Sequence, residues 1–274
     1  MRIPDWIVYV LALGVVLFVF LPDEEDAMAP ESPPGEVLRG EGRPLPPPSA
    51  FDERILVQTD EPMDGTGSAF ALNRQGQWLT ARHVVDGCDD VALEVQPGTF
   101  VPVRARRVSE EADLAVLYTG RAPRGLPVDA GRELTIGTQG FHIGFPQGQP
   151  GEATSKLLSR SRLIIRGERS SEENVLAWAE QGRTRNLSGS LGGLSGGPVI
   201  AADGQVIGVT IAESPRRGRI YTTSPATLAK FLAEEQVENS DASTPRPYSI
   251  QNYWSQADRL RREKVVVKVV CRVQ

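Results

Sequence analysis

The stretch "GGLSGGPVI", residues 192–200, places four glycines around a single serine and follows them with proline and two β-branched residues. Glycine and proline are frequent in surface turns, so one interpretation is an ordinary loop. The other interpretation is chemical. A nucleophilic hydroxyl must stand clear of its own backbone, and amide N–H groups must reach a negatively charged oxygen beside it. Glycine allows both because it has no side chain, so Ser195 is a candidate nucleophile.

Composition limits the partners of the chain. It has 274 residues, of which 40% are hydrophobic and 24% charged, with a formal net charge of −5. A chain of this length can bury one large core or two modest ones. Proteins that bind nucleic acid usually carry a basic face, so nucleic acid is not an expected partner. No group of His and Cys has the spacing of metal ligands, so we expect neither metal nor cofactor.

The N-terminal segment has the composition of a membrane anchor. Residues 6–21 are uncharged and almost entirely apolar, and Arg2 precedes them while the acidic run 23–26 follows. The positive-inside rule then places the N-terminus in the cytoplasm and the remaining chain outside. We expect a transmembrane segment at 1–21 in a bacterial inner membrane, with the following domain in the periplasm. Secretion after cleavage of a signal peptide is the alternative.

Two further segments frame a β-rich domain. Residues 22–50 carry eight prolines, which predicts a solvated spacer. From Phe51 to Gln236, short apolar runs alternate with turn residues, as is typical of all-β barrels and sandwiches. A helix is expected at 224–236, with Ser224 as its N-cap. The tail, 237–274, predicts a short helix followed by a strand. The expected strands are 68–73, 78–81, 90–95, 100–108, 114–119, 140–145, 157–167, 174–180, 196–211 and 219–224.

A nucleophilic serine needs a base and a group that orients the base. The chain has only two histidines. His142 alternates with apolar residues on an expected strand, which favours a structural role, whereas His83 follows a strand end in "WLTARHVV". Asp113 heads the apolar strand "ADLAVLY", where an unpaired carboxylate would be costly. We therefore predict that His83 and Asp113 pair beside Ser195.

The order of these residues and their local sequences resemble a known family. "GTGSAFAL" (65–72), "WLTARHVV" (78–85), "ADLAVL" (112–117), "GFPQG" (144–148), "GLSGGPVI" (193–200) and "GQVIGVT" (204–210) resemble the trypsin-like serine proteases, particularly the HtrA/Deg branch. The resemblance covers about residues 53–235. It implies an all-β fold of two packed six-stranded antiparallel barrels, with the active site in the cleft between them.

The resemblance also implies roles for individual residues. Ser195 would attack a peptide carbonyl, His83 would act as the base, and Asp113 would orient the imidazole. The backbone N–H groups of Gly193 and Ser195 would form the oxyanion hole. The primary substrate pocket would be lined by Gly189, Ser190, Thr210, Ile211, Ala212 and Glu213.

The sequence departs from the family in two respects. HtrA proteases usually carry a PDZ domain after the protease domain, and the residues that follow Glu235 are too few for one. The primary pocket lacks the aspartate that confers a preference for Arg or Lys. Glu213 either restricts the pocket to small side chains or points to solvent in the loop that follows.

The two cysteines, Cys88 and Cys271, form the last expected contact. In an oxidising compartment two cysteines predict one disulfide, which would fasten the tail near His83. The alternative is two free buried thiols.

These observations predict a membrane-tethered, extracytoplasmic serine endopeptidase that acts on protein or peptide substrates, in quality control or processing of envelope proteins. The alternative is a binding or scaffold protein on the same fold with little or no turnover. The sequence does not indicate the oligomeric state.

Overall fold

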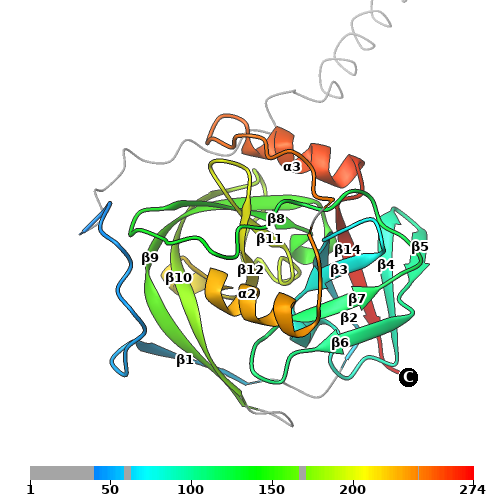
Figure 1. The fold of residues 1–274 in the computed structure, drawn as a ribbon, viewed down its shortest axis with the longest axis horizontal. Coiled ribbons are helices and arrows are strands. Elements are labelled where there is room, and N and C mark those ends of the chain that lie inside the picture. Colours follow the sequence, from blue (N-terminus) through cyan, green and yellow to red (C-terminus); the bar gives the residue numbers. More distant parts are fainter. Residues whose placement is uncertain (1–39, 59–62, 167–170, 240) are drawn as a thin grey trace, which may run out of the picture.

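A computed structural model describes residues 40–58, 63–166, 171–239 and 241–274. The predicted transmembrane segment 1–21 and most of the predicted spacer lie outside these residues. Within the described ranges, no helix has both the length and the apolar character needed to cross a membrane. The described part of the chain is mostly β, with two curled sheets and few helices (Figure 1).

The first sheet contains seven strands in the order β5-β4-β14-β2-β3-β7-β6. Its pairings are all antiparallel. Six of its strands come from one continuous stretch of chain, and the seventh comes from the C-terminal tail. The strands are β2 (Gly65–Ala71), β3 (Gln77–Thr80), β4 (Asp90–Gln96), β5 (Thr99–Pro102), β6 (Ala105–Val108), β7 (Ala115–Tyr118) and β14 (Val266–Arg272).

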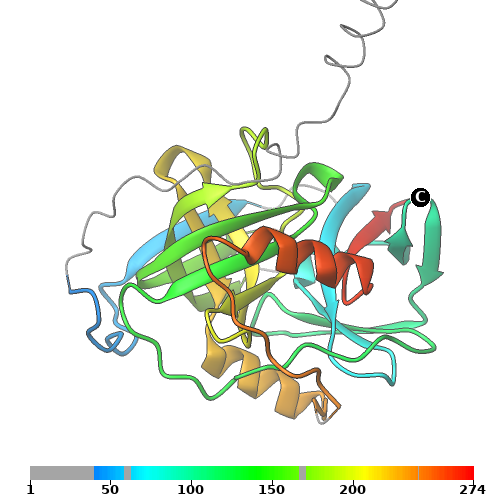
Figure 2. The same cartoon turned by 90° about the horizontal axis from the view of Figure 1, so that it is seen from above.

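The second sheet also contains seven strands, in the order β1-β9-β10-β13-β12-β11-β8, and β8 pairs in addition with β9. The two longest strands of this sheet, β9 and β10, form an antiparallel pair (Figures 1 and 2). The strands are β1 (Glu53–Gln58), β8 (Gln139–Gly144), β9 (Gly151–Arg166), β10 (Ser171–Arg183), β11 (Pro198–Ala201), β12 (Val206–Ser214) and β13 (Arg219–Thr223).

The strand count differs from the expected six in each barrel. β1 joins the edge of the second sheet and runs parallel to β9, so this sheet is not purely antiparallel. β14 inserts between β2 and β4 of the first sheet. Both added strands come from segments outside the expected barrel strands: β1 precedes the first of them and β14 follows the last. An unpaired strand edge offers N–H and C=O groups to an extended segment nearby, so such segments can join a sheet.

The two sheets share a hydrophobic core. Phe70 and Leu117 of the first sheet belong to the same buried cluster as Phe141 and Tyr221 of the second. A smaller cluster around the fully buried Trp178 fills the rest of the second sheet. Because this shared core fixes the sheets relative to each other, loops from both can contribute to one site.

Two helices complete the described chain. α2 (Pro225–Glu234) begins after Ser224, whose hydroxyl accepts a hydrogen bond from the backbone N–H of Thr227 (3.1 Å), as the predicted N-cap requires. α3 (Tyr253–Arg262) leads directly into β14 (Figures 1 and 2). The tail therefore has the predicted order of helix and strand.

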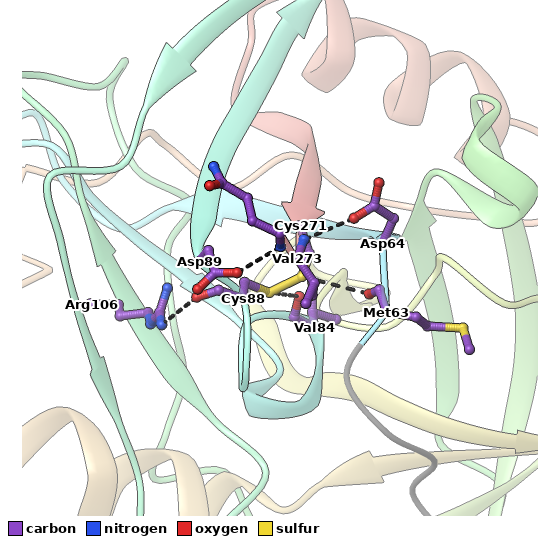
Figure 3. Close-up of a disulfide and its surroundings, with 9 residues drawn as sticks. Met63, Asp64, Val84, Cys88, Asp89, Arg106, Cys271 and Val273 are labelled. Atoms are coloured by element: carbon purple, nitrogen blue, oxygen red, sulfur yellow. Dashed lines mark hydrogen bonds between the residues drawn. A yellow bond between two sulfur atoms is a disulfide. The ribbon is translucent and has the colours of Figure 1, made fainter.

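A disulfide joins the tail to the loop that follows His83. Cys88 and Cys271 are bonded, with their Cα atoms 5.5 Å apart (Figure 3). Hydrogen bonds hold the last residues on both sides of this bridge: the Val273 N–H donates to Asp64 Oδ1 (2.8 Å) and the Gln274 N–H to Asp89 Oδ2 (2.7 Å). The expected link between the tail and the histidine loop is thus present.

The described end of the predicted spacer, residues 40–50, lies along the second sheet. The Leu45 N–H donates to the Leu134 carbonyl (2.9 Å), and Arg160 Nε donates to the Pro46 carbonyl (2.7 Å). Proline-rich backbone retains free carbonyl groups that can accept such bonds. This part of the segment is therefore attached to the domain, while most of its side chains remain exposed to solvent.

Candidate active site

His83 lies where a buried strand ends at the surface. The apolar residues of β3 run into a short 3₁₀ turn, Arg82–Val84, whose first and last side chains are buried. The His83 side chain between them remains 35% exposed. His83 is the one exposed residue of the buried stretch "WLTARHVV", so its neighbours hold the imidazole at a fixed place at the surface.

Asp113 holds His83 through both of its carboxylate oxygens. Oδ2 lies 2.6 Å from His83 Nδ1, and Oδ1 accepts a hydrogen bond from the His83 backbone N–H (2.9 Å). The Asp113 side chain is only 2% exposed. Because Nδ1 is engaged by Asp113, the other ring nitrogen, Nε2, is the one available as a base.

The pair also sets the charge of both groups. Burial lowers the pKa of His83, but the charge and the hydrogen bond of Asp113 together outweigh it and raise the pKa above its ordinary value. Burial raises the pKa of Asp113, and its interactions with His83 outweigh that effect and hold the pKa below its ordinary value. Asp113 is therefore ionised at neutral pH and favours a protonated His83.

Ser195 lies in a turn of the second sheet that packs against the end of β3. Its carbonyl accepts a hydrogen bond from the Ser68 N–H (2.8 Å). A Cβ atom on the next residue, Gly196, would come within 3.0 Å of the Ala81 backbone nitrogen, and Gly196 has a φ of +86°. The turn thus requires glycine there in order to place Ser195 beside the strand that leads to His83. Within the described residues, the hydrogen bonds do not include one from Ser195 to His83, and such contacts often tighten only when substrate binds.

The glycine before the serine turn has backbone geometry suited to binding an oxyanion. Gly193 has a φ of +95°, and a Cβ on it would lie 2.5 Å from the Phe145 carbonyl. In the part of the chain that the structure describes, neither the Gly193 N–H nor the Ser195 N–H donates to a protein acceptor. Two N–H groups without a protein acceptor, one on the candidate nucleophile itself and one two residues before it, are the arrangement that stabilises a tetrahedral intermediate.

A small cavity lies beside Ser195. Its volume is about 30 Å³. Of the residues predicted for the substrate pocket, Thr210, Ala212 and Glu213 line it, whereas Gly189, Ser190 and Ile211 do not. The turn that carries Ser195 and one residue of β13 complete the lining: Leu191, Gly192, Leu194 and Ile220.

Glu213 forms one side of this cavity. Its Oε1 accepts hydrogen bonds from the Leu191 N–H (2.7 Å) and from the Ser190 hydroxyl. The alternative in which Glu213 points to solvent is therefore not the one found. Ser190, although outside the lining, holds the carboxylate in place.

His142 has the structural environment expected for it. It is fully buried, with Nε2 2.7 Å from Ser155 Oγ and Nδ1 3.1 Å from Thr210 Oγ1. Burial lowers its pKa to about 3, so it stays neutral at physiological pH.

A second acidic side chain lies behind Asp113, and no pattern of residue types in the sequence indicates it. Glu173, on β10, accepts a hydrogen bond from the Asp113 backbone N–H through Oε2 (2.8 Å). Burial raises the pKa of Glu173 to about 8. Glu173 also lines a larger cavity of about 440 Å³ between the Ser109–Ala112 turn, β10 and α2. No metal-binding group of three His, Cys, Asp or Glu side chains occurs among the residues described.

Comparison with known proteins gives consistent results at three levels. Residues 67–209 match the family model described as a trypsin-like peptidase domain. The putative serine protease HhoB of Synechocystis is 31% identical over 67% of this chain and 43% of its own length. A probable periplasmic serine endoprotease, DegP-like, of Hahella chejuensis is 29% identical over 61% of this chain and 32% of its own length. This chain thus spans less than half the length of these relatives.

Solved structures show the same fold at lower identity. The active form of the Rv3671c protease from M. tuberculosis is 17% identical, with a TM-score of 0.51 over 75% of this chain and 97% of that one. An inactive form of the Rv3671c protease is 20% identical, with a TM-score of 0.50 over 61% of this chain and 83% of that one.

Proposed function

Because the chain belongs to the trypsin-like peptidase domain family, with curated relatives that are HtrA- and Deg-type serine proteases, we propose that it hydrolyses peptide bonds through Ser195, His83 and Asp113. Ser195 Oγ attacks the carbonyl carbon while His83 Nε2 takes its proton. The acyl-enzyme forms when His83 returns that proton to the leaving amine. Water then attacks the carbonyl carbon of the acyl-enzyme ester while His83 Nε2 takes a proton from it. His83 returns that proton to Ser195 Oγ as the product acid leaves.

The observation that carries this proposal is the buried carboxylate beneath an exposed imidazole, next to a serine flanked by two unpaired amides. Asp113 uses both oxygens on His83, which fixes the ring and stabilises its charged form. The Gly193 and Ser195 N–H groups, which donate to no protein acceptor among the described residues, would stabilise the negative charge that develops on the carbonyl oxygen. Removal of one such donor typically lowers turnover about 100-fold or more.

A fluorophosphonate probe on the full-length protein in detergent tests the proposal. We expect mass spectrometry to find the probe on Ser195 in the wild type and not in the Ser195→Ala or His83→Ala variants. An exposed serine elsewhere, such as Ser188, remains unlabelled and serves as an internal control. Absence of labelling in a folded wild type would favour the alternative, a binding or scaffold protein on this fold.

The cavity beside Ser195 indicates a preference for small side chains at the residue whose carbonyl is attacked. A cavity of about 30 Å³ is far smaller than the several hundred Å³ of an ordinary ligand pocket, which favours a short side chain. Because Glu213 forms one side, its length limits the depth. We propose that the substrates carry Ala, Ser or Gly at this position.

Glu213→Ala should therefore broaden specificity. We expect the ratio of kcat/KM for a Leu peptide over an Ala peptide to rise by about tenfold or more, since each methylene that a pocket accepts is worth roughly 10-fold or more. The matched control is Glu133→Ala, an exposed glutamate away from the cavity. An unchanged ratio in Glu213→Ala would mean that the Glu213 carboxylate does not determine the substrate preference.

We also propose that the protease domain faces the bacterial periplasm and is tethered by residues 1–21. The proposal is supported by the apolar run at 6–21, the acidic residues after it, and the disulfide, which persists in oxidising compartments. Several relatives are named as probable periplasmic endoproteases. External protease should digest the domain in spheroplasts but not in intact cells, and release into the medium would indicate the cleaved form.

A further inference from the structure

Ser68, in the middle of β2, makes hydrogen bonds through every polar atom it has. Its side chain is completely buried. The hydroxyl donates to the Gly193 carbonyl (2.8 Å) and accepts from the Phe145 N–H (2.9 Å). Its backbone N–H donates to the Ser195 carbonyl (2.8 Å), and its carbonyl accepts from the Thr80 hydroxyl (2.7 Å).

We propose that Ser68 is a positioning residue for the oxyanion hole, because its hydroxyl fixes the Gly193 carbonyl and thereby the direction of the Gly193 N–H. The inference rests on the proposed function and goes beyond it. Ser68 touches neither substrate nor His83. It acts on the nucleophile turn from the opposite sheet.

The geometry follows from the two peptide planes on either side of Gly193. In the plane before it, the Gly192 carbonyl accepts from the Gln147 N–H (2.5 Å). In a trans peptide the C=O and the following N–H point in opposite directions. The Gly193 N–H therefore points away from Gln147, and among the described residues it donates to no protein acceptor.

The plane after Gly193 contains the Gly193 carbonyl and the Leu194 N–H. The carbonyl accepts from the Ser68 hydroxyl (2.8 Å), and the Leu194 N–H donates to the Leu191 carbonyl within the same turn (2.9 Å). Glycine at a positive φ has a broad choice of backbone angles, so the plane before Gly193 does not determine the plane after it. Ser68 is the contact that ties this second plane to the opposite sheet. Loss of the hydroxyl leaves the Gly193 carbonyl without this partner and leaves the plane, among the described contacts, with the Leu194 bond inside its own turn, so the direction of the Gly193 peptide is less strictly fixed.

Packing limits this position to a side chain as small as serine. A Cβ on Gly144 would lie 2.3 Å from the Ser68 hydroxyl, and one on Gly67 would lie 2.4 Å from a Val84 methyl. β2 is therefore closely surrounded by backbone and by the turn that carries His83. A side chain with an additional heavy atom at 68, such as threonine, would displace one of these neighbours.

The test compares full-length wild type with Ser68→Ala and Ser68→Cys, using Ser161→Ala as the matched control. Ser161 is another fully buried serine, and its hydroxyl has no hydrogen-bond partner. We expect Ser68→Ala to lower kcat by about 10- to 100-fold, with KM changed less than about threefold. Ser68→Cys, a weaker donor of similar size, should show a smaller loss in the same direction.

Two readouts separate positioning from a general loss of structure. Active-site titration counts competent enzyme, so a lower kcat per titrated site reports the site itself. A peptidyl boronic acid forms a tetrahedral adduct that uses the oxyanion hole, and its inhibition constant should rise by about the same factor as kcat/KM falls. The His83 pKa measured by NMR should not move, since Ser68 makes no hydrogen bond to the His83–Asp113 pair among the described contacts.

The outcomes are distinct. A wild type that no fluorophosphonate labels overturns the proposed function, and this inference with it. A labelled wild type with Ser68→Ala at wild-type kcat and boronate affinity overturns this inference only. The same holds if Ser161→Ala loses as much activity as Ser68→Ala, or if the loss lies entirely in the titrated fraction. Should Ser68→Ala fail to fold, Ser68→Cys decides by the same readouts.

Discussion

The two histidines have opposite environments, which should be visible in their titration. His142 has a pKa lowered to about 3 by burial, whereas Asp113 raises the pKa of His83 above its usual 6.5. NMR of histidine-labelled protein should therefore show one ring that titrates above pH 6.5 and one that does not change between pH 5 and 9. Peptide hydrolysis should rise with pH through the titration of His83, because only neutral imidazole accepts a proton.

His83→Ala assigns the titrating signal. If both rings titrated near pH 6.5, His142 would be open to water and His83 would not be paired with Asp113 in solution. A His83 pKa below 6.5 would mean that Asp113 does not hold the imidazole in solution. Because the pKa of His83 is higher in the folded state than in the unfolded state, the stabilisation from its protonated form is complete below pH 6.5. This stabilisation is lost as the pH rises through the His83 pKa.

Glu173 should give the stability of the protein a second pH dependence. Burial raises its pKa from 4.5 to about 8, so between these values the folded chain keeps a proton that the unfolded chain has released. The free energy of unfolding therefore decreases as pH rises from about 5 to 8. Glu173→Gln keeps an acceptor for the Asp113 N–H and cannot ionise, so its decrease should be smaller over this range.

Urea unfolding at pH 5, 6.5 and 8 measures this difference. Glu172→Gln, an exposed neighbour on the same strand, is the control and should parallel the wild type. The difference between wild type and Glu173→Gln isolates Glu173 from the groups that face it, Asp113 and Arg82, because both variants retain them. Parallel curves for the two proteins would mean that Glu173 is ionised and hydrated in the folded state.

The residues that the sequence indicated and those it missed differ in a physical way. Ser195, His83 and Asp113 could be predicted because each chemistry needs a particular residue type next to a glycine turn, a strand end or an apolar strand. Ser68 and Glu173 could not, because their partners are the backbone groups of Gly193 and Asp113. Any sequence supplies those groups, so no pattern of residue types marks the contact.

At the scale of elements, α3 is held by a buried ion pair. Arg261 Nη2 lies 2.7 Å from Glu152 Oε2 on β9, and the side chains are only 9% and 4% exposed. Arg261 also donates to the Gly144 and Gly151 carbonyls. A helix with several basic residues is more often solvated on its basic face. The sequence could not show that one arginine turns inward toward a glutamate distant along the chain.

Arg261→Ala should be strongly destabilising, since it leaves the Glu152 charge buried without its partner. We expect a loss of about 3 to 5 kcal/mol in the free energy of unfolding. Arg262→Ala, the exposed next residue, should cost little. Thermal and urea unfolding of the two variants measure the contrast. Similar values for both would show that the pair is open to water and contributes no more than a surface contact.

The strands themselves were largely predictable, but their partners were not. Short apolar runs between turn residues predict β2, β4, β8 and β10 to within a few residues. β1 was missed because its segment has no clear alternation and lies half-exposed at a sheet edge. The place of β14 was not predictable at all, since local pattern predicts a strand without saying which strands pair with it.

At the scale of the whole molecule, the C-terminal tail completes the first sheet through that strand. β14 pairs with β2 on one side and β4 on the other, so the first sheet is complete only when the tail has arrived. The same tail carries Cys271, which is bonded to Cys88 in the loop after His83. The strand and the bridge therefore make separable contributions: one completes the hydrogen bonds of a sheet, and the other restricts the unfolded chain.

Two variants separate these contributions. The double variant Cys88→Ser/Cys271→Ser keeps β14 and loses only the bridge, so it should fold and lose about 2 to 5 kcal/mol of stability.

A chain that stops after Glu263 lacks β14 entirely. It leaves the facing edges of β2 and β4 unpaired and exposes the apolar side chains that Val266, Val267 and Val269 cover. We expect it to be unfolded or aggregated, with no fluorophosphonate labelling, whereas the double variant is labelled like the wild type. Circular dichroism and gel filtration report folding, and mass spectrometry reports labelling. A truncated chain that melts within a few degrees of the double variant would mean that the sheet closes between β2 and β4 without the tail.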